Sequence, residues 1–533
     1  MVSPLKRFVC HSNLHHSTFL MSYYLGIDVG TTGTRAVVID GEGKVVGGQS
    51  AEHEPISSPF PQWAEQNPEN WWTAVQQATR AVLQATQVKG EDIRGIGLSG
   101  QMHGLVLLDR NNAVLRPSII WCDQRCQAEA DDITRTVGYD RLIEVTCNPA
   151  LTGFTAPKLA WVKSHEPRVY DQIHKVLLPK DYIRFRLTGQ FASEVSDASG
   201  TTLLDVVERR WSSELVQKLS FNLDWLPEVH ESTVISGQLS ASVAQELGLK
   251  TGTPVAGGGG DQASGGVGNG IVSEGIVSST IGTSGVVFAF MEKPARDRKG
   301  RVHTFCHAVP QKWHVMGVTQ GAGLSLRWFR DQFGGQEVTL SPFLKQDSYE
   351  LLTQQAAQAK PGCEGLIFLP YLMGERTPHL DANARGVLFG LTGRHTRADV
   401  LRAVLEGVAY SLKDSFMIFD EMQVRITQVR ASGGGGRSAL WRQIQADVFD
   451  KEICTVAADE GAAFGAALIA AVGAGEFSSV EEACRRSIRL TNHTQPIPDN
   501  VRRYQEFYQV YRSLYGALKP GFDRVTEIVQ GNQ

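Results

Sequence analysis

A single carboxylate lies within a run of glycines near the middle of this sequence. Asp261 belongs to the stretch Ala-Gly-Gly-Gly-Gly-Asp-Gln-Ala-Ser-Gly-Gly, residues 256–266, which follows a short apolar-leaning segment. Ordered glycine loses much backbone entropy, so such a cluster usually marks positive φ or a close approach of the backbone to a bulky group. Two interpretations follow: a surface turn with a solvated aspartate, or a catalytic carboxylate at the floor of a cleft.

Asp28 is a second carboxylate in an unusual place. It lies between Ile27 and Val29 on a predicted strand, two residues before a glycine turn. Aspartate is a poor strand former, and a buried carboxylate is destabilising unless a partner compensates its charge. Mg²⁺ keeps several waters and binds one or two carboxylates, so it would supply that partner. An Asx bond from this aspartate to its own turn is the alternative.

Two glycine hairpins of the same design carry hydroxyl groups. Each has an apolar strand, a Gly-Thr-hydroxyl-Gly turn and a β-branched strand that returns. The turns are Gly30-Thr31-Thr32-Gly33 and Gly282-Thr283-Ser284-Gly285. Converging N–H groups and hydroxyls form a concavity that suits phosphate oxygens, whereas a plain hairpin needs only the glycines. Since the sequence lacks the GxxxxGK(S/T) motif, a phosphate would be bound by paired hairpins and not by a P-loop.

Two further polar turns follow predicted strands. A Ser-Gly-Gln-Met-His-Gly turn places Met102 and His103 at a bend between apolar segments. Strands of α/β proteins end at the ligand cleft, which favours a binding role for this histidine over a structural one. A run of four glycines that includes Gly434 and Gly435 allows a flat ring or a phosphate to lie against the backbone. A permissive strand-to-helix loop is the other interpretation.

The elements that must position these residues form an internal repeat. One hairpin begins near residue 24 and the other near residue 275, so each opens about half of the 533-residue chain. This length exceeds one hydrophobic core, and the repeat indicates a duplicated α/β domain with a ligand between the halves. The predicted division is a disordered extension at 1–21, a first domain at 22–271, a second domain at 272–495 and a helical tail at 496–533.

The composition excludes several classes of function. A net charge of -4 with 42% hydrophobic residues describes an ordinary globular chain without the basic excess of a nucleic-acid binder. No apolar run reaches the ~18 residues of a membrane helix. The eight cysteines are scattered, as is typical of free thiols in the reducing cytoplasm. We therefore expect a cytoplasmic protein that acts on small molecules.

Eight motifs in order make the chain resemble the FGGY carbohydrate kinases over roughly residues 22–520. They are Asp28-Val-Gly-Thr-Thr-Gly-Thr, Ser99-Gly-Gln-Met-His-Gly, Gly153-Phe-Thr-Ala-Pro-Lys-Leu-Ala-Trp, Leu177-Leu-Pro-Lys-Asp-Tyr, Gly258-Gly-Gly-Asp, Gly282-Thr-Ser-Gly, Pro370-Tyr-Leu-Met-Gly-Glu-Arg-Thr-Pro-His and Ser432-Gly-Gly-Gly-Gly-Arg-Ser. The resemblance implies the actin-like, ribonuclease H-like fold with an interdomain cleft, and phosphorylation of a sugar by ATP with Mg²⁺. A homodimer is an expectation from the family alone.

The Gln-Met-His-Gly turn and the Gly-Glu-Arg-Thr-Pro-His segment resemble the members that act on D-xylulose. This resemblance implies formation of D-xylulose 5-phosphate, a step of xylose catabolism that feeds the pentose phosphate pathway. Gln262 is a departure, since many relatives carry asparagine beside the aspartate. The alternatives are another ketose or polyol such as ribulose, glycerol or gluconate, and a non-catalytic actin-like sensor that binds nucleotide and sugar.

The resemblance also implies roles for single residues. Asp261 is the general base that accepts the proton of the attacking sugar hydroxyl, and Asp28 orients Mg²⁺ or its waters. The residues implied to bind sugar are Met102, His103, Asp261 and Gln262. The residues implied to bind nucleotide are Gly30, Thr31, Thr32, Gly282, Thr283, Ser284, Gly434 and Gly435. The sequence assigns Lys158 a packing role by default and leaves Arg376 and His379 between nucleotide and domain interface.

Overall fold

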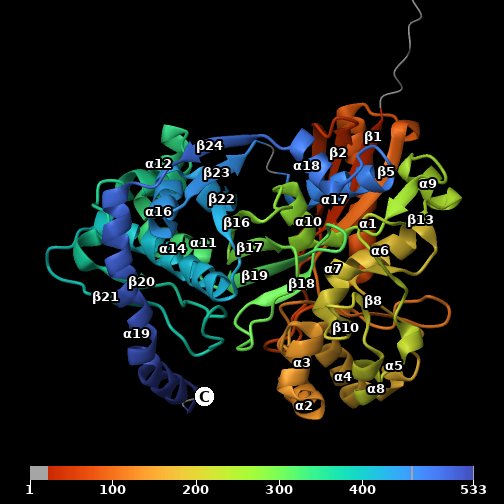
Figure 1. The fold of residues 1–533 in the computed structure, drawn as a ribbon, viewed down its shortest axis with the longest axis horizontal. Coiled ribbons are helices and arrows are strands. Elements are labelled where there is room, and N and C mark those ends of the chain that lie inside the picture. Colours follow the sequence, from red (N-terminus) through yellow and green to blue (C-terminus); the bar gives the residue numbers. More distant parts are fainter. Residues whose placement is uncertain (1–21, 458–459, 532–533) are drawn as a thin grey trace, which may run out of the picture.

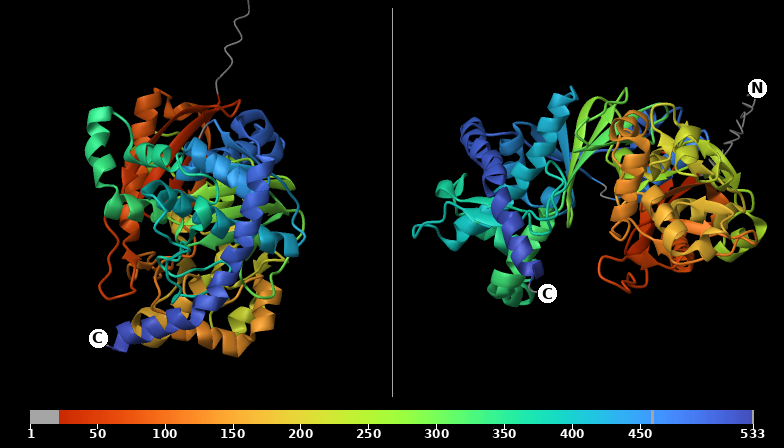
Figure 2. Two further views of the ribbon diagram at one scale, coloured as in Figure 1. Left: turned by 90° about the vertical axis from the view of Figure 1, so that its left-hand side faces the viewer. Right: turned by 90° about the horizontal axis from the view of Figure 1, so that it is seen from below.

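The computed structural model describes residues 22–457 and 460–531. The predicted extension at 1–21 therefore lies outside the described residues. The chain forms two bodies, each built on a seven-stranded mixed sheet. The view from below in Figure 2 shows the red-to-yellow first half of the chain on one side and most of the second half on the other.

The first sheet carries both predicted carboxylates. Its central strand β1 (Tyr23–Val29) pairs antiparallel with β2 (Gly33–Asp40) and parallel with β5 (Ile93–Gly100). The apolar side chains of β1 are buried on both faces, which is typical of a central strand in a parallel pairing. The strands outside this core are β3 (Val45–Glu52), β13 (Ile235–Gln238), β14 (Pro254–Ala256) and the short β15 (Gly259–Gly260), which pairs with the end of β5.

The second sheet repeats this core. Strand β16 (Gly275–Ile281) pairs antiparallel with β17 (Gly285–Met291) and parallel with β22 (Ile426–Ser432). The same hairpin-plus-parallel-strand arrangement in both sheets confirms the duplicated, actin-like α/β fold. The other strands of this sheet are β18 (His303–Cys306), β19 (Trp313–Thr319), β23 (Glu452–Val456) and β24 (Leu490–Thr494).

One helix from late in the chain packs on the first sheet, and a second packs beside that helix. In Figure 1 the blue helices α17 (Gly461–Gly473) and α18 (Val480–Ser487) lie beside the red strands of that sheet. Close contact requires glycine in the strands, because a Cβ on Gly26 would lie 1.9 Å from the carbonyl oxygen of Ala463. Helix α17 also crosses α10 (Asp261–Gly268). The chain thus returns to the first sheet after completing most of the second, and the domain boundary at 271 stays a prediction.

Further helices cover the outer faces of both sheets. Helix α1 (Pro68–Thr86) packs on β2 and β3, with Asn67 as its N-cap and Trp71 buried as a core anchor. Helices α14 (Arg397–Glu421) and α16 (Ala439–Phe449) pack on the second sheet, while α11 (Ala322–Phe333) packs on α14 and α19 (Pro498–Gly531) packs on α16.

The remaining elements of the first half form the lobe below the first sheet in Figure 1 or lie along its edges. They are β4 (Glu65–Gln66), β6 (Val106–Leu108), β7 (Ser118–Ile119), α2 (Gln127–Val137), α3 (Tyr139–Thr146), α4 (Thr155–His165), α5 (Pro167–Tyr170), β8 (Lys175–Leu177), α6 (Pro179–Thr188), β9 (Ser193–Glu194), α7 (Val195–Ala198), β10 (Leu204–Asp205), β11 (Arg210–Trp211), α8 (Ser213–Lys218), β12 (Val229–His230) and α9 (Ala241–Leu247). Those of the second half are α12 (Gly335–Leu344), α13 (Ser348–Ala356), β20 (Ile367–Leu369), β21 (Val387–Phe389) and α15 (Gly433–Arg437). Four short 3₁₀ turns occupy Gly90–Asp92, Ser199–Thr201, Leu223–Trp225 and Cys363–Gly365. None of the helices in the described part of the chain combines the length and apolar character that a membrane crossing needs.

Candidate active site

The strand register brings the two predicted carboxylates to one edge of the first sheet. Asp28 lies opposite Ser99 of β5, and Gly259 of β15 pairs with the same serine from the other side. Asp261 follows β15 directly and is the first residue of α10. A carboxylate in the first turn of a helix is stabilised by the positive end of the helix dipole.

The glycine run before Asp261 is an ordered structure and not a flexible turn. Gly258 has a φ of +79°, and a Cβ there would lie 2.0 Å from the carbonyl oxygen of Leu98. A Cβ on Gly260 would lie 2.9 Å from Cγ of Met102. Glycine is therefore required so that the loop can pass over β5 and so that the Met102 side chain can pack beneath the residue before Asp261.

The protonation of Asp261 is tuned by its surroundings. Burial, together with the negative charge of Asp28, raises the pKa of Asp261 to about 7, while the backbone and side-chain amides of Gln262 act in the opposite direction. Burial also raises the pKa of Asp28 to about 6. Two carboxylates that oppose each other's ionisation near neutral pH are typical of a site that transfers protons.

Asp28 fits the role of a ligand to Mg²⁺ or its waters. Its Oδ1 is buried and has no hydrogen-bond partner among the described residues. An orphaned, partly buried carboxylate oxygen is the hard donor that this cation prefers. The described residues contain no cluster of three His, Cys, Asp or Glu side chains that could hold a metal by itself. A cation here would therefore take most of its ligands from water and from phosphate oxygens.

The first hairpin presents its threonine hydroxyls on a fixed turn. The N–H of Gly30 donates to the carbonyl of Gly33 at 3.0 Å, which closes the turn. The indole Nε1 of Trp121 donates to Oγ1 of Thr31 at 2.9 Å, so the hydroxyl proton of that threonine is free to donate to a ligand. Thr32 at the tip is exposed. The sequence did not predict a role for Trp121, because its contact with Thr31 joins segments that are far apart in the chain.

The second hairpin and the glycine run at 433–436 come together in the second body. Ile281 forms a bridge with Gly433, and a Cβ on Gly435 would lie 2.4 Å from the Cδ1 atom of that isoleucine. The sequence left two interpretations of this glycine run, a surface for a flat ring or phosphate and a permissive strand-to-helix loop. The four glycines instead form the short helix α15 themselves, with Gly434 exposed and Gly435 buried.

The start of α11 adds a cation to this second hairpin. The N–H groups of Gly323 and Leu324 donate to the carbonyls of Gly282 and Thr283 at 2.9 and 3.0 Å. One turn later, Nη2 of Arg327 donates to the hydroxyl of Thr283 at 2.6 Å. Ser284 closes the turn, since its carbonyl accepts from the N–H of Gly282 at 3.0 Å. The sequence analysis missed this arginine, because its contact with Thr283 joins segments that are 44 residues apart.

His103 is held in a strained backbone conformation by a buried lysine. Its φ is +69°, which side chains other than glycine rarely adopt. Nζ of Lys158 donates to the carbonyl oxygens of His103 and Gly153 at 2.9 and 2.7 Å, and Oγ1 of Thr155 donates to the former at 3.1 Å. The lysine predicted to pack therefore also fixes the direction of the histidine turn.

The imidazole of His103 is neutral and has one defined free nitrogen. Burial and the nearby charge of Lys158 lower its pKa to about 3. Nδ1 lies 3.0 Å from the carbonyl oxygen of Gly200, which can only accept, so Nδ1 carries the proton. Nε2 is then an acceptor that suits a sugar hydroxyl. A Cβ on Gly200 would lie 2.2 Å from this ring, so glycine is required for the contact.

Aromatic rings from both bodies meet around this histidine. Phe154 lies with its ring centroid 4.7 Å from that of His103, and Phe305 of β18 lies 6.1 Å away. His303 of the same strand stacks on Phe305 at 5.7 Å. Neither ring of β18 could be assigned from the sequence, because the contact joins segments about 200 residues apart.

Arg376 and His379, both in the Gly-Glu-Arg-Thr-Pro-His segment, have different surroundings. The carboxylate of Glu375 accepts from the backbone N–H groups of Gln320 and Arg376 at 2.9 and 2.7 Å, which fixes the segment to the end of β19. The guanidinium of Arg376 makes no ion pair or hydrogen bond with the described residues, and burial lowers its pKa to about 10. His379 stacks on Tyr515 of α19 at 3.5 Å, which is a packing contact.

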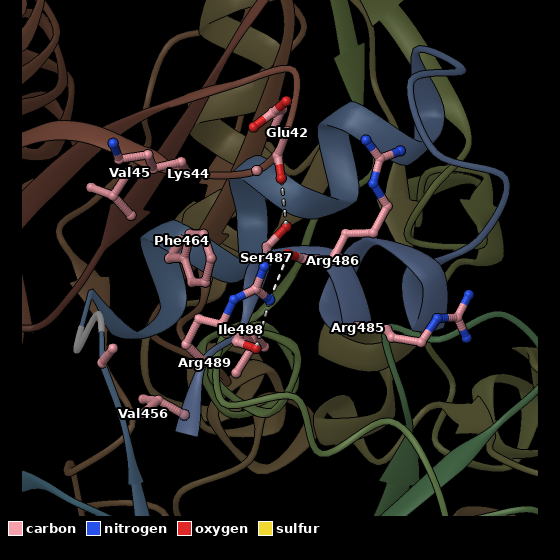
Figure 3. Close-up of a pocket in the computed structure, with 13 residues that line it drawn as sticks. Glu42, Lys44, Val45, Val456, Phe464, Arg485, Arg486, Ser487, Ile488 and Arg489 are labelled. Atoms are coloured by element: carbon pink, nitrogen blue, oxygen red, sulfur yellow. Dashed lines mark hydrogen bonds between the residues drawn. The ribbon is translucent and has the colours of Figure 1, made fainter. Parts of the chain in front are cut away.

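A cavity of about 840 Å³ lies elsewhere, between the turn at 42–45 and the end of α18. Figure 3 shows that Arg485 and Arg486, which line it, extend in different directions. None of the predicted site residues lines this cavity. The carboxylates and turns described above therefore remain the candidate active site.

Comparison with known proteins gives the same assignment over nearly the whole chain. The profile of the FGGY family of carbohydrate kinases matches in its N-terminal domain at residues 23–268 and in its C-terminal domain at residues 277–474. The chain is 41% identical to the xylulose kinase of Escherichia coli over 500 residues, 93% of this chain and 99% of that protein.

Two further relatives show how wide the similarity is. The crystal structure of xylulose kinase from Rhodospirillum rubrum superposes with a TM-score of 0.86 at 30% identity, covering 94% of this chain and 100% of that one. A gluconokinase of Bacillus subtilis is 31% identical over 514 residues, 96% of this chain and 99% of that protein. The matched domains, the duplicated sheets and the paired carboxylates together show that the chain belongs to the FGGY family of carbohydrate kinases.

Proposed function

We propose that this kinase transfers the γ-phosphoryl group of ATP to D-xylulose, which gives D-xylulose 5-phosphate and ADP. The observation that carries the proposal is the pair Asp261 and Asp28 at the edge of the first sheet, next to the turn of His103, whose neighbour Met102 packs against Gly260. The likeness to xylulose kinases of up to 41% identity supports the choice of sugar.

Asp261 acts as the general base. Its carboxylate accepts the proton of the O5 hydroxyl while that oxygen forms a bond to the γ-phosphorus, and the bond from this phosphorus to the β–γ bridging oxygen breaks. A pKa of about 7 makes this carboxylate a stronger base than a solvated aspartate while leaving about half of it ionised at neutral pH. The glycines before it keep the approach of the phosphoryl group free of side chains.

The two hairpins hold the phosphates from opposite sides. Thr31 and Thr32 donate from the first body, and Thr283 and Ser284 from the second, where Arg327 adds positive charge. Asp28 would hold Mg²⁺ through its buried Oδ1 or through water, and the cation would supply positive charge to the phosphate oxygens. The exposed face at Gly434, with the buried Gly435 behind it, gives the adenosine a surface without side chains.

The sugar lies between the histidine turn and the start of α10. Nε2 of His103 accepts a hydroxyl proton, the side-chain amide of Gln262 adds a donor and an acceptor, and Met102 shapes the wall by packing. The pocket needs a neutral imidazole for this contact. The low pKa of His103 secures that state throughout the physiological pH range.

An aldonate such as gluconate is a second candidate substrate. The guanidinium of Arg376 has no partner among the described residues, and its charge contributes to the low pKa of both His103 and His303. An unpaired guanidinium beside the sugar wall would take a carboxylate by a bidentate contact. The 31% identity to a gluconokinase agrees with this candidate.

The test is coupled ADP release with MgATP and D-xylulose, D-ribulose, L-ribulose, glycerol, D-gluconate or no sugar. We expect selective turnover with D-xylulose, and Asp261→Asn as the matched inactive control. A preference for gluconate would move the assignment to the second candidate. ADP release that is equal with and without every sugar would overturn the proposal.

A further inference from the structure

The loop that precedes Asp261 is held by hydrogen bonds, one of which is made to a buried side chain outside the candidate active site. The N–H groups of Gly257 and Gly258 donate to the carbonyls of Val234 and Ser232, both at 2.9 Å. The N–H of Gly260, the residue before the proposed base, donates instead to a side chain, Oγ of Ser196, at 3.1 Å. The last backbone group before Asp261 is thus fixed by a hydroxyl.

The direction of this hydroxyl is set by a buried carboxylate. Because Oγ of Ser196 accepts from Gly260, its own proton points to Oε1 of Glu194, 2.9 Å away. Glu194 also accepts from the N–H groups of Ser196 and Asp197 at 2.7 and 2.8 Å and from Oγ of Ser232 at 2.9 Å. Burial raises the pKa of Glu194, and these hydrogen bonds together with Lys180 act in the opposite direction. Four donors converge on one carboxylate, so the serine hydroxyl is held between Glu194 and the N–H of Gly260.

A buried lysine compensates the charge behind the loop. Nζ of Lys180 lies 2.5 Å from Oδ1 of Asp181, 3.7 Å from Oε1 of Glu194 and 3.9 Å from Oδ2 of Asp197. All four side chains are at most 1% exposed. Burial raises the pKa of Asp197 well above its ordinary value, and neither of its oxygens has a hydrogen-bond partner among the described residues.

We propose that Ser196, oriented by Glu194 and Lys180, is a positioning residue for phosphoryl transfer. It fixes the backbone at Gly260 and thereby aims the Asp261 carboxylate at the sugar hydroxyl. The inference rests on the proposed role of Asp261 as general base. An error of about 1 Å in the position of a base is enough to reduce a rate by about 10² while substrate binding is retained.

Ser264 provides a matched control for this serine. Its hydroxyl is also fully buried and also adjoins the loop, since a Cβ on Gly259 would lie 2.7 Å from it and 3.3 Å from Oγ of Ser196. Unlike Ser196, it makes no hydrogen bond with any described residue. Removal of its hydroxyl therefore changes the packing near the loop without releasing the backbone.

The experiment compares Ser196→Ala, Ser196→Thr and Ser264→Ala by steady-state kinetics at saturating MgATP, with thermal melting as a check of folding. We expect Ser196→Ala to lower kcat at least about tenfold with KM for sugar and ATP within about twofold, and Ser196→Thr to recover most of the rate because it keeps the hydroxyl. Ser264→Ala is expected to keep kcat within about twofold.

Three outcomes would overturn the inference: a normal kcat in Ser196→Ala, an equal loss in Ser264→Ala, or a loss that resides in KM. If Ser196→Ala does not fold, Glu194→Gln, which keeps the shape and removes the charge, must show the same loss in kcat alone. Failure of the proposed function is distinct, because wild-type enzyme would then lack turnover of D-xylulose. The series would be run on whichever sugar the wild type phosphorylates.

Discussion

The two hairpins have the same strand pairing and the same turn, yet their strands differ at one position. Asp28 of β1 has a buried oxygen without a partner, whereas the equivalent Thr280 of β16 exchanges a hydrogen bond of 2.8 Å with Ser432. The carboxylate of Asp28 thus has an oxygen that could accept a further donor or a cation, whereas Thr280 is paired within its own sheet. The scaffold occurs twice, and we propose that the acid–base chemistry is confined to the first body.

The surroundings of the turns differ in the same sense. The first body brings a second carboxylate, Asp261, to the hairpin, and the second body brings a cation, Arg327. We therefore expect the first side to accept the proton and hold Mg²⁺, and the second side to bind and neutralise phosphate. Five experiments test whether the two bodies differ in this way.

The largest effect is expected from Asp261→Asn. The amide cannot accept the hydroxyl proton, so kcat should fall by at least about 10² while KM for sugar and ATP changes little. Steady-state kinetics with a melting curve measures this. Near-normal turnover in a folded variant would show that the first body does not supply the base.

Asp28→Ala should reduce kcat by about tenfold or more and raise the Mg²⁺ concentration needed for half-maximal rate, with sugar affinity retained. The reason is that the orphaned Oδ1 is the protein's contribution to the cation shell. A magnesium titration at fixed ATP measures the shift. An unchanged titration would mean that the two hairpins do not differ in the way proposed.

The pH dependence should show the two carboxylates acting on each other. The base must be ionised, so kcat/KM should rise about tenfold per pH unit at low pH and level off above the Asp261 pKa of about 7. Asp28→Asn removes a like charge, so the same limb should move to lower pH. The dependence of kcat/KM on pH is measured in wild type and in Asp28→Asn. If the rise at low pH occurs at the same pH in both, the charge of Asp28 does not affect the ionisation of Asp261.

Arg327→Met tests the second body. Loss of an exposed cation beside Thr283 should raise KM for ATP about threefold to tenfold and leave KM for the sugar unchanged. The difference from wild type should shrink at high salt, because exposed charges are screened. Kinetics at low and high ionic strength measure both effects, and a change in sugar KM would argue against the separation.

Thr280→Val should have the smallest effect. It removes the hydrogen bond to Ser432 and is expected to lower the free energy of unfolding by about 1 kcal/mol, with kcat nearly unchanged. Denaturant unfolding measures the first and steady-state kinetics the second. A loss of rate similar to that of Asp28→Ala would show that the two hairpins are chemically equivalent after all.

The sequence was most informative where a residue conflicts with its local element. Asp28 on a strand, Asp261 among glycines and the repeated hydroxyl turns each violate a local preference, and the structure brings the two carboxylates to one sheet edge. Local patterns said little about residues that reach the site from elsewhere. Trp121, Arg327 and Phe305 lie on segments whose composition is ordinary, and only their contacts give them a role.

Lys158 and Ser196 illustrate the same limit for buried polar groups. A lysine in a helix and a serine near a turn are common, and no spacing in the sequence says which carbonyl or N–H each one meets. The structure shows that Lys158 bonds the carbonyl of His103 and that Ser196 bonds the N–H of Gly260. Both act on backbone that is far away in sequence.

The sequence by itself determined the fold family, the duplication and the identity of the two carboxylates, because these depend on residue types within short, ordered motifs. Only the tertiary structure decided the pKa shifts of Asp261 and His103, the hydrogen bond between Thr280 and Ser432, and the hydrogen bond from Gly260 to Ser196. Those properties depend on burial and on charges contributed by other segments. Solvation and hydrogen bonding are set by neighbours in space, and the order of residues along the chain does not specify those neighbours until it folds.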